Sequence, residues 1–258
     1  MIFESHAHYE DKKFDADRVE LLSSMREHNI GTIVNVGSSL QTSALTMELA
    51  KRNKDVYAAI GVHPEVIVEM SEPGMLWLRT NAKFNQKVVA IGEIGLDYYW
   101  EKEPEVQEKQ RYWFIEQLKL ARELEMPVII HSRDAAEDTM KIMKEYAVGL
   151  SGVIHCFSYS PEIAREYVKM GFYIGVGGVV TFKNAKKLVE TVEQIPLERI
   201  LVETDCPYMA PEPHRGSRNS SLEIPYIIDK IAEIKGITAK EVELTTEANA
   251  KQMYRIDQ

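Results

Sequence analysis

The chain has 258 residues, of which 45% are hydrophobic and 28% are charged, and its formal net charge is −9. This composition is typical of a globular protein and excludes a membrane-spanning one, because no apolar run approaches the roughly 18–20 residues needed to cross a bilayer. The negative charge argues against a broad basic surface for nucleic acid. Any contact with phosphate must therefore be local, or supplied by metal ions.

The expected location follows from the N-terminus and the cysteines. The first residues lack the basic region and apolar run of a secretory signal. The two cysteines, Cys156 and Cys206, do not suggest a disulfide framework. We therefore expect a cytoplasmic protein without a membrane partner, and no obligate protein partner is evident.

Short apolar, β-branched runs alternate with longer helical patterns along the chain. Strands separated by helices indicate βαβ units and a parallel sheet, and eight such units match a (β/α)8 TIM barrel. An open doubly wound sheet is the alternative, which the regularity of the units disfavours. We expect one domain over residues 1–258. The expected strands, in chain order, are 1–8, 32–38, 56–64, 88–97, 127–133, 151–158, 172–178 and 200–207.

Helical patterns fill the intervals between these strands. The clearest covers residues 104–126, with Pro104 near its start and Pro127 just beyond it. Two further helical patterns, 221–236 and 238–254, follow the last strand. We expect both to complete the outer ring of helices.

His6 and His8 stand two residues apart in the first expected strand. Successive side chains of a strand point to opposite faces, so both imidazoles point the same way, which suits a metal ion. Catalytic groups of such barrels lie at the C-terminal ends of the strands. A histidine alone is more often a buried packing residue, but convergence on one rim indicates a metal site. The other expected strand ends carry His63, Glu93, His131, His155 and Asp205.

Four imidazoles and two carboxylates are more than one tetrahedral zinc ion needs. They suit two divalent ions roughly 3.5–4 Å apart with a bridging carboxylate. Glu93 is the expected bridge, because its strand lies between the other two groups of ligands. His131 and His155 would hold one ion, and the ion beside strands one and eight would be held by His6, His8 and Asp205. Zinc, manganese and magnesium all remain open as the metal.

Several other side chains are candidates for contact with a substrate. We favour His63 as a phosphate contact over a seventh ligand, with a packing role as the alternative. Tyr98 and Tyr99, after strand four, are positioned to stack on bases or to pack. The planar fork of arginine suits phosphate, although a solvated surface role is the alternative. The candidate arginines are Arg133, Arg215 and Arg218.

The motifs SHAH, GVHP, GEIGLDYY, PVIIHSRDA, GVIHCFS, TFKNA and ETDCPYMAPEPHRGSRN occur in this order over nearly the whole chain. Together they resemble the TatD-family hydrolases, which have barrels of the metal-dependent amidohydrolase type. The resemblance implies a metal-dependent deoxyribonuclease acting on phosphodiester bonds, with the same six residues as metal ligands. Two places depart from the family pattern. Glu4 stands where an aspartate is usual, and Ser220 and Ser221 stand where Glu-Pro is frequent.

The expected activity is hydrolysis of DNA by a hydroxide bound to two metal ions. Asp205 would serve as ligand and proton acceptor, and Glu93 as the bridge, which makes both catalytic. Single-stranded ends are the expected substrate, since a barrel mouth is concave and no basic surface is evident to hold duplex. A metal-dependent ester or amide hydrolase of the wider amidohydrolase group is the alternative, although many of those carry a carboxylated lysine where this chain has Glu93. A non-catalytic binding barrel is the third possibility.

Overall fold

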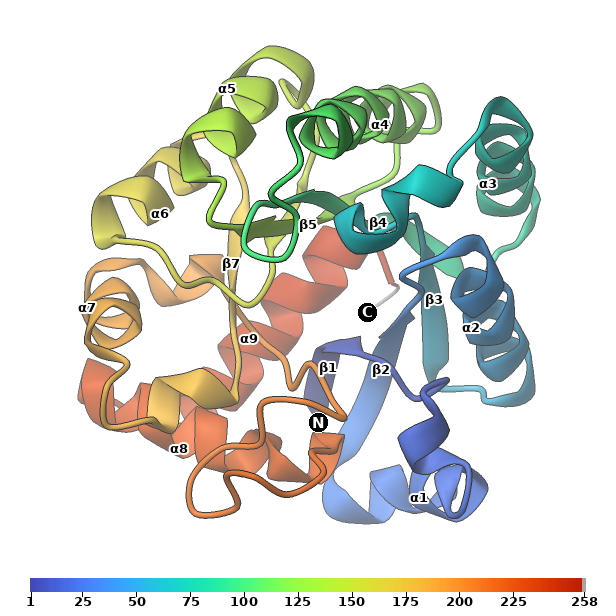
Figure 1. Cartoon of the computed structure of the whole chain (residues 1–258). Helices are drawn as coiled ribbons and strands as arrows, with labels where there is room; N and C mark the ends of the chain where they lie inside the picture. The colour runs from blue at the N-terminus through green and yellow to red at the C-terminus, as the bar shows by residue number, and fades with distance from the viewer. Residues whose placement is uncertain (257–258) are drawn as a thin grey trace.

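The computed structural model describes residues 1–256, and the expected domain over 1–258 extends two residues beyond them. Eight parallel strands pair in the order of the chain and are surrounded by helices (Figure 1). This arrangement confirms the predicted TIM barrel. The strands are β1 (Ile2–Ala7), β2 (Ile30–Val36), β3 (Val56–Ile60), β4 (Val88–Asp97), β5 (Val128–Arg133), β6 (Gly152–Ile154), β7 (Tyr173–Val176) and β8 (Ile200–Val202).

The seam between β1 and β8 is made by the end of β1 and by residues just beyond the two strands. One isolated parallel bridge joins Ala7 to Cys206 there. The His8 N–H donates to the Cys206 carbonyl at 2.8 Å, and the Asp205 N–H donates to the His6 carbonyl at 3.0 Å. The barrel is therefore closed at the place where three of the expected ligands lie.

Helices alternate with the strands as expected. The pattern over 104–126 forms a helix that begins at Pro104, where the missing N–H costs nothing. A capping box stabilises the start of the helix at Leu40 and of the helix at Ala239. The helices are α1 (Arg18–Ser24), α2 (Leu40–Arg52), α3 (Glu72–Phe84), α4 (Pro104–Glu123), α5 (Ala136–Tyr146), α6 (Pro161–Lys169), α7 (Lys186–Gln194), α8 (Ile224–Lys235) and α9 (Ala239–Tyr254). Within residues 1–256, none is both long and apolar enough to cross a membrane.

Several strands are shorter than their apolar runs, which moves functional side chains into the loops that follow. His63, His155 and Asp205 lie just after β3, β6 and β8. Cys156 and Asp205 have positive φ values, 43° and 56°, in the left-handed region. A left-handed residue ends the extended conformation, so these chains turn across the mouth of the barrel instead of continuing the ladder.

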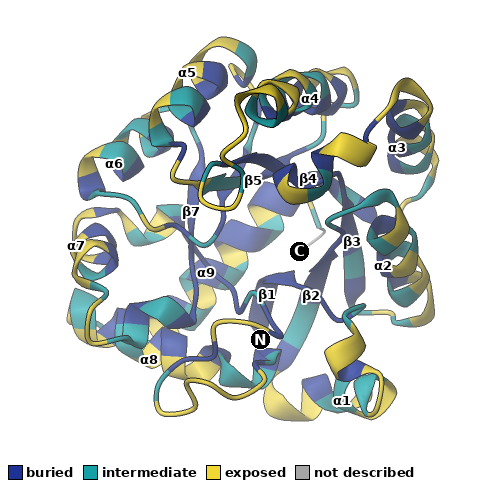
Figure 2. Ribbon diagram, viewed as in Figure 1, coloured by how far each residue is buried: buried dark blue, intermediate teal, exposed yellow. Residues whose placement is uncertain are grey.

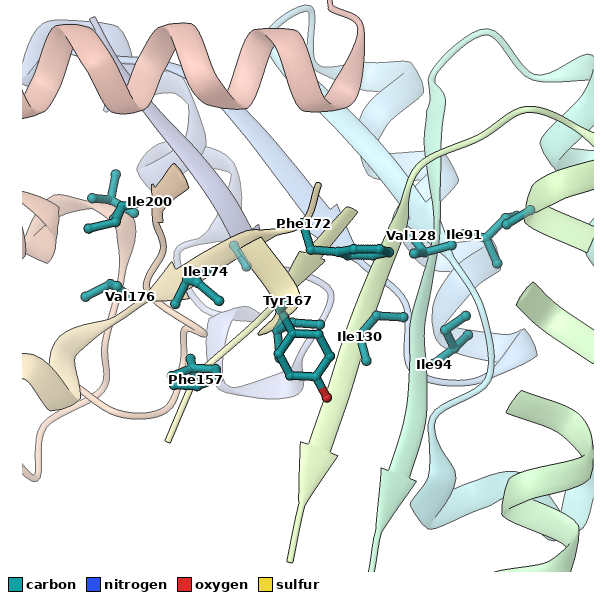
Figure 3. Close-up of a cluster of buried hydrophobic side chains, with 14 of the residues drawn as sticks. Ile91, Ile94, Val128, Ile130, Phe157, Tyr167, Phe172, Ile174, Val176 and Ile200 are labelled. Atoms are coloured by element: carbon teal, nitrogen blue, oxygen red, sulfur yellow. The ribbon is translucent and has the colours of Figure 1, made fainter. Parts of the chain in front are cut away.

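The larger apolar core lies between the strands and the surrounding helices. Figure 3 shows part of it, where Ile130 of β5 and Ile174 of β7 lie with Tyr167 of α6 and with Phe172. The helices present buried residues to the strands and exposed ones to solvent (Figure 2). The packed strands hold the mouth of the barrel as a rigid frame.

A second, smaller core fills the inside of the barrel, and α9 closes it. Every strand contributes at least one residue, and Ala250, Met253 and Tyr254 of α9 join them. Tyr254 stacks on Phe3 with ring centroids 5.8 Å apart, and its hydroxyl donates to the Ser5 carbonyl at 2.8 Å. In Figure 1 α9 crosses behind the strands. The expectation that the last helix belongs to the outer ring was wrong, because α9 covers the end opposite the mouth.

Candidate metal centre

One oxygen of Glu93 meets side chains from the β1–β8 seam. The Nε2 atoms of His6 and His8 are 3.1 Å apart. Glu93 Oε2 lies 3.6 Å from the first and 3.9 Å from the second, and Asp205 Oδ1 lies 3.7 and 3.3 Å from them. Ligand atoms around a tetrahedral ion with bonds near 2.0–2.2 Å are roughly 3.3–3.6 Å apart. His6, His8 and Glu93 therefore form a group with about the spacing of ligands to one ion, and Asp205 lies within reach of both imidazoles.

The other oxygen of Glu93 meets a different set of imidazoles. Glu93 Oε1 lies 2.9 Å from His131 Nδ1 and 2.6 Å from His155 Nε2, and these two nitrogens are 3.3 Å apart. His63 Nε2 lies 3.4 Å from the same oxygen. The structure thus gathers the six expected ligands around one carboxylate, here called the six-residue cluster: His6, His8, Glu93, His131, His155 and Asp205.

Hydrogen bonds at the far side of each ring determine which nitrogen can bind a cation. Nδ1 of His8 donates to the Val36 carbonyl at 2.7 Å, so Nε2, on the side of Glu93 and Asp205, is the nitrogen that would bind a cation after losing its proton. Nε2 of His131 donates to Asp97 Oδ2 at 3.0 Å, so Nδ1, which faces Glu93, is the nitrogen that would bind a cation after losing its proton. Both tautomers suit a divalent cation, so these residues fit the expected metal.

His63 has the opposite hydrogen-bonding pattern. Its Nδ1 accepts the N–H of Glu65 at 3.2 Å, at the start of a short 3₁₀ helix, Pro64–Glu69. A neutral ring that accepts at Nδ1 carries its proton on Nε2, and this N–H points towards Glu93 Oε1. His63 is therefore arranged as a donor at Nε2, although it also stands at ligand spacing from Glu93 and His131. Its contact with a substrate stays a prediction.

The six-residue cluster places carboxylates and imidazoles next to one another in a buried site, where each changes the pKa of the other. Burial raises the pKa of Glu93, but the charges of His155 and His63 and hydrogen bonds from His131 and His155 outweigh it and hold that pKa well below its usual range. Burial lowers the pKa of His6 to about 4. Burial also disfavours the charged form of His131, yet its hydrogen bonds to Asp97 and Glu93 raise that pKa to about 9. Ionised carboxylates here require nearby positive charge, which protons or divalent ions supply.

Two carboxylates that the sequence reasoning did not select support the cluster. Asp97, the last residue of β4, orients His131 as described. Glu203 is fully buried, accepts the N–H of Cys156 and lies 3.9 Å from His155 Nδ1. Burial raises the pKa of Glu203 to about 8. Both residues could have been found from the sequence, because each is an acidic residue at or just after the end of an expected strand and close to an expected ligand.

Glu4 and Ser221, at the two places that depart from the family pattern, contact each other. The Glu4 carboxylate accepts from Ser221 Oγ at 2.9 Å, from the Thr204 N–H at 2.9 Å and from Thr204 Oγ1 at 2.6 Å. It also accepts the His6 N–H at 3.2 Å. Burial raises its pKa to about 7. The longer acid supports the seam by joining β1 to the segments after β8, and among the described residues its hydrogen-bond donors are backbone and hydroxyl groups, not imidazoles.

The three candidate arginines contact residues outside the six-residue cluster. Arg218 makes a two-pronged ion pair with Asp17, at 2.7 and 2.5 Å. Arg215 lies over the ring of Phe182 at 4.2 Å. Within residues 1–256, none of the three pairs with a member of the six-residue cluster, and their contact with phosphate stays a prediction. The third, Arg133, lies over an exposed tyrosine ring.

Comparison with known proteins identifies the family. The TatD-related DNase family matches residues 3–255. YabD of Bacillus subtilis, an uncharacterized metal-dependent hydrolase, is 43% identical over 258 residues, all of both chains. YcfH of Escherichia coli K12, with the same description, is 34% identical over 99% of this chain and 96% of its own. The crystal structure of YjjV, a TatD homologue from E. coli K12, superposes with a TM-score of 0.93 at 29% identity, covering 99% of this chain and 98% of that one. The chain therefore belongs to the TatD-related DNase family and is a metal-dependent hydrolase.

Proposed function

We propose that this hydrolase is a deoxyribonuclease that cleaves phosphodiester bonds with two divalent ions, and that it prefers single-stranded ends. The proposal rests on Glu93, whose two oxygens face two separate sets of ligand atoms. A carboxylate so arranged is suited to bridge two cations. The ions would be held by His6, His8 and Asp205 on one side and by His131 and His155 on the other.

Each residue of the site has a distinct part in the reaction. Divalent ions supply Lewis acidity for phosphate oxygens and make water acidic enough to act as a nucleophile near neutral pH. The Asp205 side chain is 19% exposed, against 5% for Glu93, so Asp205 is the carboxylate that reaches an incoming substrate and accepts a proton. The Nε2–H of His63 faces Glu93 Oε1 at 3.4 Å and would donate to a phosphate oxygen that enters beside this carboxylate. Glu203 is too deeply buried to touch substrate, and its oxygen lies 3.9 Å from His155 Nδ1, beyond hydrogen-bond distance.

The choice of DNA over other substrates is supported by the family description and by charge. The TatD-related DNase family is named for this activity. A net charge of −9 disfavours binding of long duplex by a broad surface, so a local, metal-based hold on one strand end is favoured. A cytoplasmic location is part of the proposal, and it is supported by two cysteines that are free in the structure.

The decisive experiment separates the metal requirement from the substrate. The protein is stripped with a chelator, reloaded with zinc, manganese or magnesium, and its ions are counted by elemental analysis. Each form is then assayed on a single-stranded oligonucleotide, the same sequence as duplex, a carboxylic ester and an amide. We expect two ions per chain and hydrolysis of the single strand in their presence alone. Hydrolysis of the ester or amide without any cleavage of DNA would favour the alternative of a metal-dependent ester or amide hydrolase.

A further inference from the structure

An exposed aromatic turn follows β4, in the loop that leads to α4 (Figure 1). Tyr99 is 44% exposed and Trp100 is 63% exposed, and their rings meet edge to face with centroids 4.8 Å apart. Tyr98 differs, because its hydroxyl donates to Asp138 at 2.7 Å and accepts from Arg111 at 2.8 Å. Of the two tyrosines considered from the sequence, Tyr98 is therefore held by structural contacts, while Tyr99 keeps an exposed ring with Lys102 Nζ 5.8 Å from its centroid.

Arg133 completes this surface. Its guanidinium carbon lies 3.9 Å from the centroid of the Tyr99 ring and 5.5 Å from that of Trp100. Among the residues that the structure describes, no carboxylate pairs with Arg133, whereas Arg218 and Arg111 each have an acidic partner. The guanidinium is held by the aromatic rings, and its hydrogen-bond donors remain for an anion.

The turn is joined directly to the metal centre through one carboxylate. Asp97 Oδ1 accepts the N–H groups of Tyr99 and Trp100, each at 2.9 Å, while Asp97 Oδ2 accepts from His131 Nε2 at 3.0 Å. Arg133 stands two residues after His131 in β5. The turn and the arginine are therefore held in fixed positions relative to a predicted metal ligand.

We propose that Tyr99, Trp100 and Arg133 form a platform that stacks an unpaired nucleobase of the DNA strand, while Arg133 contacts a neighbouring phosphate. This inference rests on the proposed function. A nucleobase offers a planar π face, which an exposed tyrosine, tryptophan or guanidinium recognises without regard to sequence. Bases in a duplex are already stacked and paired, so the platform selects a strand end whose bases are free. It supplies a physical cause for the proposed preference for single strands.

The test compares two single strands of equal length, one of thymidine nucleotides and one with abasic sites in place of the bases. Both carry the same phosphates, so their KM ratio reports on base contact alone. We expect the wild-type protein to show a KM roughly 5- to 100-fold lower for the strand with bases. In Trp100→Ala, and more fully in Tyr99→Ala/Trp100→Ala, the ratio should fall towards one, and Trp100→Phe should restore much of it. Alanine keeps the backbone N–H groups that donate to Asp97.

Controls distinguish a stacking role from a structural one. Tyr112→Ala removes an aromatic ring that is 51% exposed on α4 and should leave the wild-type ratio. Metal content by elemental analysis and a thermal melt accompany each variant. Equal KM for both strands in the wild-type protein, or loss of bound metal in Trp100→Ala, overturns the platform while the proposed function stands. A wild-type protein that cleaves neither strand with any ion overturns the proposed function, and the platform with it.

Discussion

Glu93 is the residue on which the two-ion proposal depends, because it contributes one oxygen to each set of ligand atoms. In Glu93→Ala the ion site at His131 and His155 keeps only these two protein ligands. The other ion site keeps three, which are His6, His8 and Asp205. We expect the variant to retain about one ion or fewer per chain and to lose DNA cleavage by about 100-fold or more. The fold should survive, because the change lies at the mouth and not in the packed layers.

Elemental analysis, a cleavage assay and a circular dichroism melt check this prediction together. Glu69→Ala, which removes an exposed glutamate from the loop after β3, is the matched control and should behave as wild type. A Glu93→Ala protein with two ions and the wild-type rate would show that Glu93 is not the bridge.

His131 makes ion binding depend on pH. Its pKa is raised to about 9, so at pH 7 Nδ1 carries a proton in the absence of a cation. An ion must displace that proton to bind. The apparent affinity should therefore rise with pH from neutrality and level off above about pH 9, and ion binding at pH 7 should release about one proton or more. Titration calorimetry in buffers of different ionisation enthalpy counts the protons.

Asp97 contributes to this pH dependence, because its carboxylate accepts a hydrogen bond from His131 and stabilises the protonated ring. Asp97→Asn should lower the pKa of His131, reduce the number of protons released at pH 7 and move the rise in affinity to lower pH. Binding without proton release in the wild-type protein would be inconsistent with the raised pKa.

At the scale of elements, the loop that leads from β8 to α8 is joined to the start of α1 by Arg218 and Asp17. If Arg218 contacts phosphate, Arg218→Ala should raise KM for DNA about tenfold with bound metal unchanged, as for loss of one charge-assisted hydrogen bond. Asp17→Ala should then leave KM unchanged or lower it, because it frees the guanidinium for the substrate.

The paired variants also test the competing explanation. A guanidinium that serves as a clamp between the loop and α1 would give the same rise in KM in Asp17→Ala as in Arg218→Ala. Steady-state kinetics on one single-stranded oligonucleotide suffices for the comparison.

At the scale of the whole molecule, net charge limits how DNA is held. A strand end bound through about three phosphates should give a slope of log affinity against log salt of roughly −2. We expect this shallow dependence for single strands and little cleavage of closed circular duplex. A slope steeper than about −5, or cutting of circular duplex as fast as of single-stranded ends, would require an extended basic surface that a net charge of −9 disfavours.

The barrel was predictable because its signal is local and repeated. Eight apolar runs separated by helical patterns occur at regular intervals, and all eight form strands. The coincidence of His6, His8, Glu93 and Asp205 near strand ends follows from the same pattern, since parallel strands bring their C-terminal ends to one rim. The structure brings the six expected donors together, while their role as ligands stays a prediction.

Other features depended on contacts between segments far apart in the chain. The position of α9 could not be read from its amphipathic pattern, because an apolar face packs equally well on the outer wall or across the end of a barrel. The partner of Arg218 is 201 residues away, so its pairing is invisible in the sequence. The sequence also does not show which oxygen of Glu93 faces which imidazole.

The sequence by itself therefore determined the barrel and the residues that gather at its mouth, because the alternation of strands and helices is visible in short segments. It also determined the family, because the family motifs occur in order along the chain. Only the tertiary structure decided which ring nitrogen of His8, His63 and His131 faces Glu93, since this depends on the atom that meets the far side of each ring. It also decided that Tyr98 is held by Asp138 while Tyr99 and Trp100 stay exposed. Neighbouring aromatic residues have the same chemistry in the sequence, and only packing against distant side chains distinguishes them.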